Sequence, residues 1–136
     1  MSLKSPLAQI EFFKRGQDVQ LTDNFHLSEF ECKCSKCLFT LISVEHVARL
    51  QELRNALKTP IKVLSGYRCS DHNQKVGGEP QSLHQFGLAT DIWASGYSSG
   101  AIYEIAKDIF DGIGLYDTWT HIDSRGFEAF WDKRRS

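Results

Sequence analysis

A set of short β-prone runs in the second half of the chain, each bounded by turn residues, most limits what it can fold into. These runs are Ile61 to Ser65, Leu88 to Ala94, Gly112 to Tyr116, Trp119 to Asp123 and Phe127 to Trp131. The last three follow one another through short turns, which is typical of neighbouring antiparallel strands. The pattern therefore predicts an α+β domain with a small, antiparallel-rich sheet.

Two segments carry apolar residues at helical spacing and are expected to cover this sheet. The first begins after Ser43 as its N-cap and ends before Pro60. Its apolar face consists of Val47, Leu50, Leu53 and Leu57. The second runs from about Ser98 to Asp111, and Gly112 can close its C-terminus. His46, in the first turn of the first helix, is expected to be solvated.

The size and composition of the chain favour one globular domain. Its 136 residues are 41% hydrophobic and 12% aromatic, which is enough for one core and too little for two domains of ordinary size. We expect residues 1–136 to form a single domain in which residues 1–20 are an N-terminal extension, and we expect the protein to be a monomer.

The charge and hydropathy patterns disfavour several kinds of partner. The formal net charge is −1, so a protein that follows nucleic-acid phosphates is disfavoured. No stretch approaches the roughly 18 apolar residues that a membrane-spanning helix needs, and the first residues lack the apolar core of a signal peptide. We therefore expect no nucleic-acid partner, no membrane span and a chain that is cytoplasmic as made.

Alternation along two of the strands can bring metal-binding side chains together. In the run from Leu88 to Ala94, Asp91 points to one face, and in the run from Trp119 to Asp123, His121 and Asp123 share a face. If these strands are neighbours, Asp91 and His121 converge. With His84 they supply the three ligands of a catalytic zinc site, which leaves one position open for water. These ligand types make zinc the default metal.

Several motifs around these residues resemble a known family. The motifs are SGYRCSDHN, VGG, SLHQFGLATDI, GIGLY and THID, and together with FHLSEFECKC they extend the resemblance over residues 25–126. They are similar to the zinc D-Ala-D-Ala carboxypeptidase and L-alanyl-D-glutamate peptidase family of peptidoglycan hydrolases, whose fold the Hedgehog signalling domain shares. The family signature is Ser-x-His-x-x-Gly-x-Ala-x-Asp. It is met by Ser82, His84, Gly87, Ala89 and Asp91.

The resemblance implies a role for each matching residue. The ligands of one catalytic zinc ion would be His84, Asp91 and His121. Zinc would lower the pKa of a water molecule and polarise the scissile carbonyl. Arg68 would bind a substrate carboxylate or stabilise the developing oxyanion. Ser82 and Tyr67 would contact the substrate.

Two carboxylates are candidates for the general base, the residue that takes the proton from the zinc-bound water. Many family members have an acidic residue three positions before the last zinc histidine, and here that position is Thr118. Asp117 is the candidate general base, although a turn residue between two strands is an equally good interpretation. Asp123 is the alternative, and it is better suited to orienting a zinc ligand.

Four cysteines are clustered too closely to be chance core thiols. They are Cys32, Cys34, Cys37 and Cys69. They could form a structural zinc site, two disulfides in any of three pairings, or a set of free thiols. Either a zinc site or disulfides would connect the N-terminal segment to the residue next to Arg68 and keep this substrate-binding arginine in a fixed position. Zinc is favoured in a reducing cytoplasm and disulfides after export.

These observations favour a zinc metallopeptidase that hydrolyses an amide bond in peptidoglycan stem peptides, at the cell wall, after release or export. A D-Ala-D-Ala carboxypeptidase is preferred because a free substrate carboxylate suits Arg68, and an L-alanyl-D-glutamate endopeptidase is the alternative. The absence of an acid at Thr118 leaves open a non-catalytic cell-wall binding module of the same fold. The cysteine cluster leaves open a structural component, for example of a phage particle, with a vestigial metal site.

Overall fold

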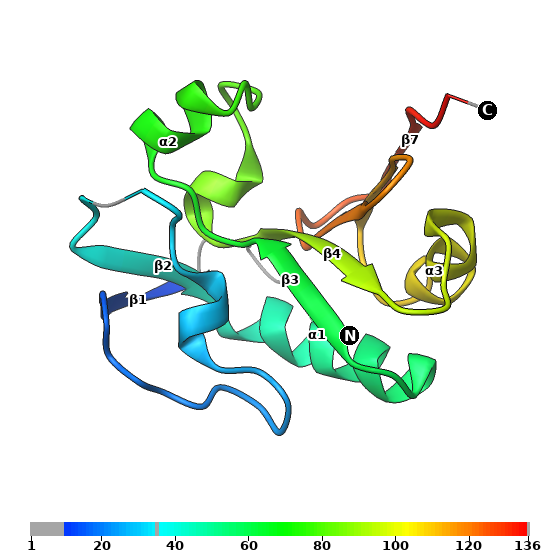
Figure 1. Cartoon of the computed structure of the whole chain (residues 1–136), viewed down its shortest axis with the longest axis horizontal. Helices are drawn as coiled ribbons and strands as arrows, with labels where there is room; N and C mark the ends of the chain where they lie inside the picture. Colours follow the sequence, from blue (N-terminus) through cyan, green and yellow to red (C-terminus); the bar gives the residue numbers. More distant parts are fainter. Residues whose placement is uncertain (1–9, 35, 136) are drawn as a thin grey trace.

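The computed structural model of the chain describes residues 10–34 and 36–135, which form two sheets surrounded by helices (Figure 1). The larger sheet has the strand order β3-β4-β6-β5-β7. Its strands are β3 (Ile61–Ser65), β4 (Ala89–Ala94), β5 (Gly112–Leu115), β6 (Thr120–Asp123) and β7 (Ala129–Asp132). The smaller sheet is the antiparallel pair of β1 (Ile10–Lys14) and β2 (Phe39–Ser43). The predicted α+β fold with an antiparallel-rich sheet is confirmed.

Three α-helices and two 3₁₀-helices complete the fold. They are η2 (Leu27–Phe30), α1 (Val44–Leu57), α2 (Ser70–Lys75), η3 (Leu83–Phe86) and α3 (Ser99–Ala106). Helix α1 confirms the prediction at both ends, because the Ser43 hydroxyl accepts a hydrogen bond from the His46 amide at 3.1 Å and the helix ends before Pro60. None of the helices in the described ranges is long and apolar enough to cross a membrane.

Helix α3 begins where predicted, with Ser98 as its observed N-cap, but it ends several residues early. The amide of Asp111 bonds the carbonyl of Asp123, so the chain has already entered the sheet at that point. Gly112 is therefore the first residue of β5 and does not close the helix. The end of the helical segment is set by hydrogen bonds to β6, which comes later in the sequence. The spacing of apolar residues within the segment carries no information about these bonds.

Strand β7 is the second difference from the prediction. We expected the last three strands to be consecutive antiparallel neighbours, but β7 pairs with β5 and runs parallel to it, with Gly114 opposite Trp131. Both edges of β6 are already occupied, by β4 on one side and β5 on the other. The free edge of β5 is therefore the one that β7 can join.

The N-terminal part contributes more structure than predicted. Strand β1 lies within residues 1–20, which we expected to be only an extension, and it pairs with β2 in register Ile10 to Ser43. Residues 1–9 lie outside the described part of the chain. The segment after Arg68 forms helix α2, which is not among the helices that apolar spacing predicts. Both elements are short, and contacts with distant segments stabilise them.

The five-stranded sheet has an apolar face and a polar face. Ile92 of β4 and Ile122 of β6 are fully buried in the core with Leu50 of α1. Asp91 and His121 alternate with them and point the other way. His46 of α1 is buried on the core side, so the expectation that it is solvated is wrong. Its ring nitrogens lie 2.7 Å from the Ser124 hydroxyl and 3.1 Å from that of Thr90.

Candidate metal centre

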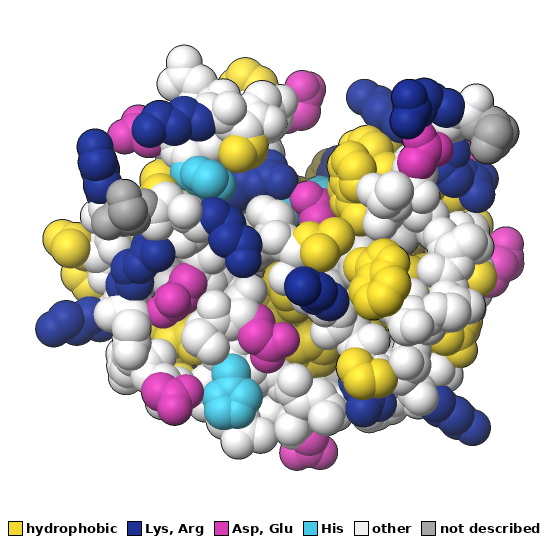
Figure 2. All heavy atoms as spheres, in the orientation of Figure 1, with side chains coloured by type: hydrophobic (Ala, Val, Ile, Leu, Met, Phe, Trp, Pro, Cys, Tyr) yellow, Lys and Arg dark blue, Asp and Glu magenta, His cyan; other side chains and the backbone are white. Residues whose placement is uncertain are grey.

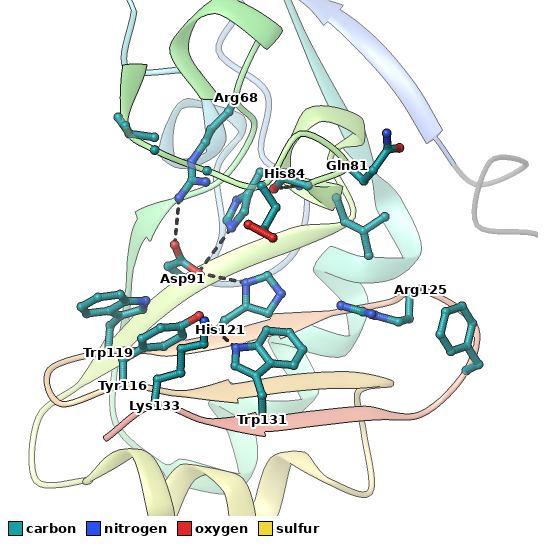
Figure 3. Close-up of a pocket in the computed structure, with 17 residues that line it drawn as sticks. Arg68, Gln81, His84, Asp91, Tyr116, Trp119, His121, Arg125, Trp131 and Lys133 are labelled. Atoms are coloured by element: carbon teal, nitrogen blue, oxygen red, sulfur yellow. Dashed lines mark hydrogen bonds and ion pairs between the residues drawn. The ribbon is translucent and has the colours of Figure 1, made fainter. Parts of the chain in front are cut away.

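A cavity of about 630 Å³ opens on the polar face of the five-stranded sheet. Strands β4 and β6 supply residues at its base, η3 and the loop before it form one wall, and aromatic side chains near β5 and β7 form the opposite wall (Figure 3). In the space-filling view the surface is hollowed between the part that carries α2 and the part that carries β7 (Figure 2).

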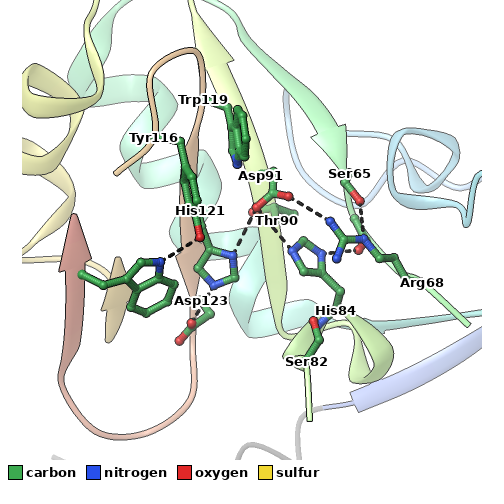
Figure 4. Close-up of polar contacts among 12 residues, drawn as sticks. Ser65, Arg68, Ser82, His84, Thr90, Asp91, Tyr116, Trp119, His121 and Asp123 are labelled. Atoms are coloured by element: carbon green, nitrogen blue, oxygen red, sulfur yellow. Dashed lines mark hydrogen bonds and ion pairs between the residues drawn. The ribbon is translucent and has the colours of Figure 1, made fainter. Parts of the chain in front are cut away.

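Three metal-binding side chains meet at the base of this cavity. Asp91 on β4 and His121 on β6 are direct partners in the antiparallel register, which confirms that they converge. His84 reaches the same point from η3 (Figure 4). Asp91 Oδ1 lies 3.1 Å from His121 Nδ1 and 3.3 Å from His84 Nε2. One ligand atom from each residue lies within 4.8 Å of the others.

The hydrogen bonds behind the two histidines determine which nitrogen is free to bind a metal. His84 Nδ1 donates to the carbonyl of Gly66 at 2.7 Å, which leaves Nε2 facing Asp91. His121 Nε2 donates to Asp123 Oδ2 at 2.8 Å, which leaves Nδ1 facing Asp91. Metal-binding histidines are oriented in this way by carbonyl and carboxylate partners. Two imidazole nitrogens and one carboxylate oxygen fit a zinc ion with an open position.

Arg68 fixes the other side of the Asp91 carboxylate. Its Nη2 donates to Asp91 Oδ2 at 3.1 Å, Nη1 to Asn73 Oδ1 at 3.2 Å and Nε to the Ser65 hydroxyl at 3.0 Å. A side chain at Gly78 would place its Cβ 2.2 Å from Asn73 Oδ1. The VGG motif therefore contains glycine where the Arg68–Asn73 pair approaches the backbone.

The charges of the centre stabilise ionised carboxylates. Burial would raise the pKa of Asp91, but hydrogen bonds from His121 and His84 hold it below its ordinary value. Burial also acts to raise the pKa of Asp123, but His121 and Arg125 lower it to about 2. Burial disfavours the charged form of His121, but the two carboxylates on either side raise its pKa above the ordinary value. Both acids are anionic at neutral pH, as metal binding requires.

The signature residues that are not ligands hold the local backbone in place. The Ser82 hydroxyl accepts a hydrogen bond from the His84 amide at 3.2 Å and so caps η3. Gly87 has a φ of 72°, and a Cβ there would lie 2.2 Å from the Leu41 carbonyl oxygen. Ser82 also lines the cavity, which is where we expected it. Its contact with substrate stays a prediction.

Asp117 and Tyr67 are not among the residues that line the cavity. Asp117 accepts hydrogen bonds from Arg135, at 2.8 Å from Nε and 3.0 Å from the backbone amide, and this arginine lowers its pKa. Tyr67 lies beside the cysteine cluster, where burial and the neighbouring thiols raise its pKa to about 12. The geometry therefore gives no support to Asp117 as general base or to Tyr67 as a substrate contact.

Asp123, the alternative base, is fully buried beneath His121. Besides the bond from His121, it accepts two hydrogen bonds from the Arg125 side chain, at 2.9 and 2.8 Å. With its oxygens occupied in this way, Asp123 is suited to orienting His121, as the sequence suggested.

The aromatic wall was missed by the sequence reasoning. The rings of Tyr116 and Trp119 stack at 4.5 Å with an interplanar angle of 6°. Trp131 Nε1 donates to the Tyr116 hydroxyl at 2.9 Å, and the Trp131 ring lies 5.1 Å from that of His121. Alternation in the run from Phe127 to Trp131 was the available signal, but the parallel placement of β7 was needed to interpret it.

The structure brings the four cysteines together, as the sequence suggested, and one sulfur from each lies within 4.8 Å of the others. The four residues are Cys32, Cys34, Cys37 and Cys69. This group and the His84–Asp91–His121 group are the two sets of three or more metal-binding side chains within the described ranges.

The α+β fold with a His–Asp–His donor set at the base of a cavity defines a protein with a candidate metal centre. A family model described as Peptidase M15 matches residues 23–123, which is most of the chain. The chain therefore belongs to the Peptidase M15 family, a family of the zinc D-Ala-D-Ala carboxypeptidase type. Among curated proteins, no significant match was found.

Proposed function

We propose that the protein is a zinc-dependent peptidase that hydrolyses an amide bond in peptidoglycan stem peptides, with D-Ala-D-Ala carboxypeptidase activity. The observation that carries the proposal is the oriented group of His84, Asp91 and His121 in a chain of the Peptidase M15 family. These three residues would hold the zinc ion. Zinc supplies an activated water and polarises a carbonyl.

Lys133 offers a further cation, besides Arg68, for the terminal carboxylate of the substrate. All three side-chain nitrogens of Arg68 already donate to neighbouring residues. Lys133 lines the same cavity, and its ammonium forms no ion pair with any residue in the described ranges. The free carboxylate of a terminal D-Ala would pair with it, as would the α-carboxylate of a γ-linked D-Glu next to an L-Ala–D-Glu bond. Lys133 leaves Arg68 the role of holding Asp91.

Glu79 and Tyr116 are the groups that the cavity offers for proton transfer. Among the described residues, the carboxylates that line it are those of Asp91 and Glu79, and Asp91 is committed to the metal centre. Glu79 would therefore accept the proton and pass it to the leaving amine. The Tyr116 hydroxyl accepts a hydrogen bond from Trp131, so its own proton is free to be donated to the substrate carbonyl oxygen.

Mass spectrometry of defined muropeptides tests the proposed activity. Zinc-loaded protein should release D-Ala from pentapeptide stems, while chelated protein and His84→Ala should not. Asp132→Asn serves as the matched control, because Asp132 pairs with Arg134 and is not a cavity residue. Cleavage between L-Ala and D-Glu would identify an endopeptidase instead. Unchanged muropeptides with full zinc occupancy would favour a binding module, and a zinc content that His84→Ala does not lower at all would favour a structural component.

Kinetics of single variants test the residue roles. Glu79→Gln should lower kcat by roughly 10²- to 10⁴-fold if Glu79 is the general base. Lys133→Gln should raise KM for peptides with a free C-terminal carboxylate and leave C-terminally amidated peptides unaffected. Asp117→Asn should retain full turnover; a large loss of kcat in this variant with normal turnover in Glu79→Gln would return the role to Asp117.

We place the protein at the cell wall, where its substrate lies, after release or export from the cytoplasm. Fractionation of cells that make the native protein tests this location. Its confinement to an intact cytoplasm, with no release step, would contradict it.

A further inference from the structure

We propose that the four cysteines form a second, structural zinc site in which every ligand is a thiolate. The site lies where the loop between η2 and β2 passes the N-terminus of α2 (Figure 1). Cys32, Cys34 and Cys37 come from the loop, and Cys69 is the residue before α2. The inference does not depend on the proposed peptidase activity, because it concerns different ligands.

The distances between the sulfur atoms match a tetrahedral site. Zinc–sulfur bonds of about 2.3 Å place the sulfurs of a tetrahedron roughly 3.8 Å apart. Cys32 and Cys69 are 3.8 Å apart, and Cys69 and Cys34 are 3.9 Å apart. Cys34 and Cys37 are closer, at 3.1 Å, but still far from the roughly 2.05 Å of a disulfide. Moreover, Cys34 has two sulfur neighbours, a pattern that a four-coordinate metal satisfies and pairwise disulfides do not.

Backbone amides point at three of the sulfurs. The Cys37 amide donates to Cys34 Sγ at 3.3 Å, the Cys69 amide to Cys32 Sγ at 3.3 Å, and the His72 amide to Cys69 Sγ at 3.4 Å. Such bonds stabilise thiolates and orient them, which is what a metal ligand needs. Cys32 is itself buried, so the site is partly shielded from water.

Four thiolates and one zinc ion would carry a net negative charge. The positive charge of Arg15, at the end of β1, lies close enough to offset part of it. Arg15, which follows β1, donates to the carbonyls of Cys32 and Cys34 at 3.0 and 2.8 Å, and its Nη1 lies 4.0 Å from Cys34 Sγ. Lys33 and Lys36 belong to the same loop. All-sulfur ligation selects zinc over hard cations such as magnesium or calcium.

The site would connect the N-terminal part of the chain to the wall of the cavity. Cys69 is adjacent to Arg68, and α2 carries Asn73, which accepts a hydrogen bond from that arginine. Fixing Cys69 therefore fixes the backbone from which Arg68 reaches Asp91. The thiolate site would hold this wall in place without contacting the substrate.

Metal analysis of the full chain, purified under reducing conditions, tests the inference. We expect two zinc ions per wild-type chain, one in His84→Ala and one in Cys34→Ser/Cys37→Ser. Lys36→Ala is the control from the same loop and should retain both. Cobalt added to His84→Ala from which zinc has first been removed by chelation under reducing conditions should give the sulfur-to-cobalt charge-transfer band and the intense visible bands of a tetrahedral thiolate complex, and the cysteine variant treated in the same way should lack them.

Three results would overturn the inference. One is a wild-type chain whose zinc is abolished entirely by His84→Ala. Another is a cobalt spectrum without sulfur bands. The third is alkylation and intact mass showing two disulfides, or four reactive thiols in the presence of excess zinc. If the cysteine variant fails to fold, the cobalt spectrum of His84→Ala still decides the question, because that protein retains all four thiols.

Discussion

At the residue scale, the environment of each histidine decides what it does. His84 and His121 each donate from one ring nitrogen to a fixed acceptor and leave the other facing Asp91. His46 is also buried, but its two nitrogens meet hydroxyl groups of Ser124 and Thr90, which are not carboxylates. The same side chain is therefore a candidate metal ligand in one setting and a neutral core residue in the other.

His46 should make stability depend on pH. Burial lowers its pKa to about 3, from an ordinary value of 6.5. His46 is therefore protonated below about pH 6.5 in the unfolded chain, but only below about pH 3 in the folded chain. The free energy of unfolding should fall across this window by on the order of 1 kcal/mol per pH unit. Urea unfolding of chelated protein between pH 7 and pH 4 measures this slope.

The matched comparison is His46→Gln with His26→Gln, since His26 lies on the surface in a described loop. The first variant should have the shallower slope, and the second should keep that of the wild type. Equal slopes in all three proteins would show that His46 is not the group responsible.

Asp123 should tune the affinity of the metal centre without binding the metal. Asp123→Asn keeps the shape of the side chain but removes the charge that orients His121, and loss of such a partner weakens zinc binding by roughly 10- to 100-fold. Competition with a chromophoric chelator measures the zinc affinity. The zinc bound by the His84→Ala form of each protein is subtracted, so that binding at the cysteine site is not counted. Asp132→Asn should bind as tightly as the wild type. Unchanged affinity in Asp123→Asn would remove its orienting role.

At the element scale, β5 owes its place in the sheet to two glycines on the cavity face. A Cβ at Gly112 would lie 2.3 Å from the Asp123 carboxylate oxygens, and one at Gly114 would lie 2.3 Å from the Trp131 ring. The glycines leave room for the carboxylate that orients His121 and for the aromatic wall. Strand β5 thus presents Ile113 and Leu115 to the core and almost nothing to the cavity.

Gly114→Ala should therefore disturb the aromatic wall. The new methyl group would displace Trp131 and break its hydrogen bond to Tyr116, at a cost of about 1–3 kcal/mol in the free energy of unfolding. Denaturant unfolding and tryptophan fluorescence measure both effects. Gly100→Ala in α3 is the control: its closest neighbour is the flexible end of Arg134, and alanine should stabilise the helix by roughly 0.5–1 kcal/mol. A Gly114→Ala protein as stable as the wild type would contradict this account.

At the scale of the whole molecule, the centre joins segments that are far apart in the chain. Asp91 and His121 come from strands of one sheet. His84 lies on the short helix η3, and Arg68 lies in the loop before the short helix α2; such short segments have few internal hydrogen bonds to hold them in place. A ligand shared by all these segments stabilises the folded state because the unfolded chain does not bring them together. The cysteine site would act in the same way on the other side of α2.

Metal removal should therefore lower the melting temperature. Zinc at about 100 times its dissociation constant contributes about 3 kcal/mol to one site, which corresponds to roughly 10 °C for a domain of this size. Differential scanning calorimetry of zinc-loaded and chelated protein measures the shift. His84→Ala should lose part of it and retain the remainder through the cysteine site. No shift on chelation would contradict zinc occupancy of either site.

The sequence by itself determined the α+β class, the first helix and the convergence of Asp91 with His121. These conclusions were accessible because they depend on local periodicity, on a cap and on alternation within strands. The signature around His84 was readable for a similar reason, since Ser82 and Gly87 set a backbone conformation within a few residues.

Only the tertiary structure decided where the remaining groups lie. Asp117 looked like a base from its position before His121, yet it pairs with Arg135. His46 looked exposed, yet it is buried against β4. The aromatic wall depends on β7 joining β5 in parallel, and the cysteine cluster on a loop meeting α2. Each of these depends on contacts between residues distant in sequence, and local patterns carry no information about which distant segments will pack together.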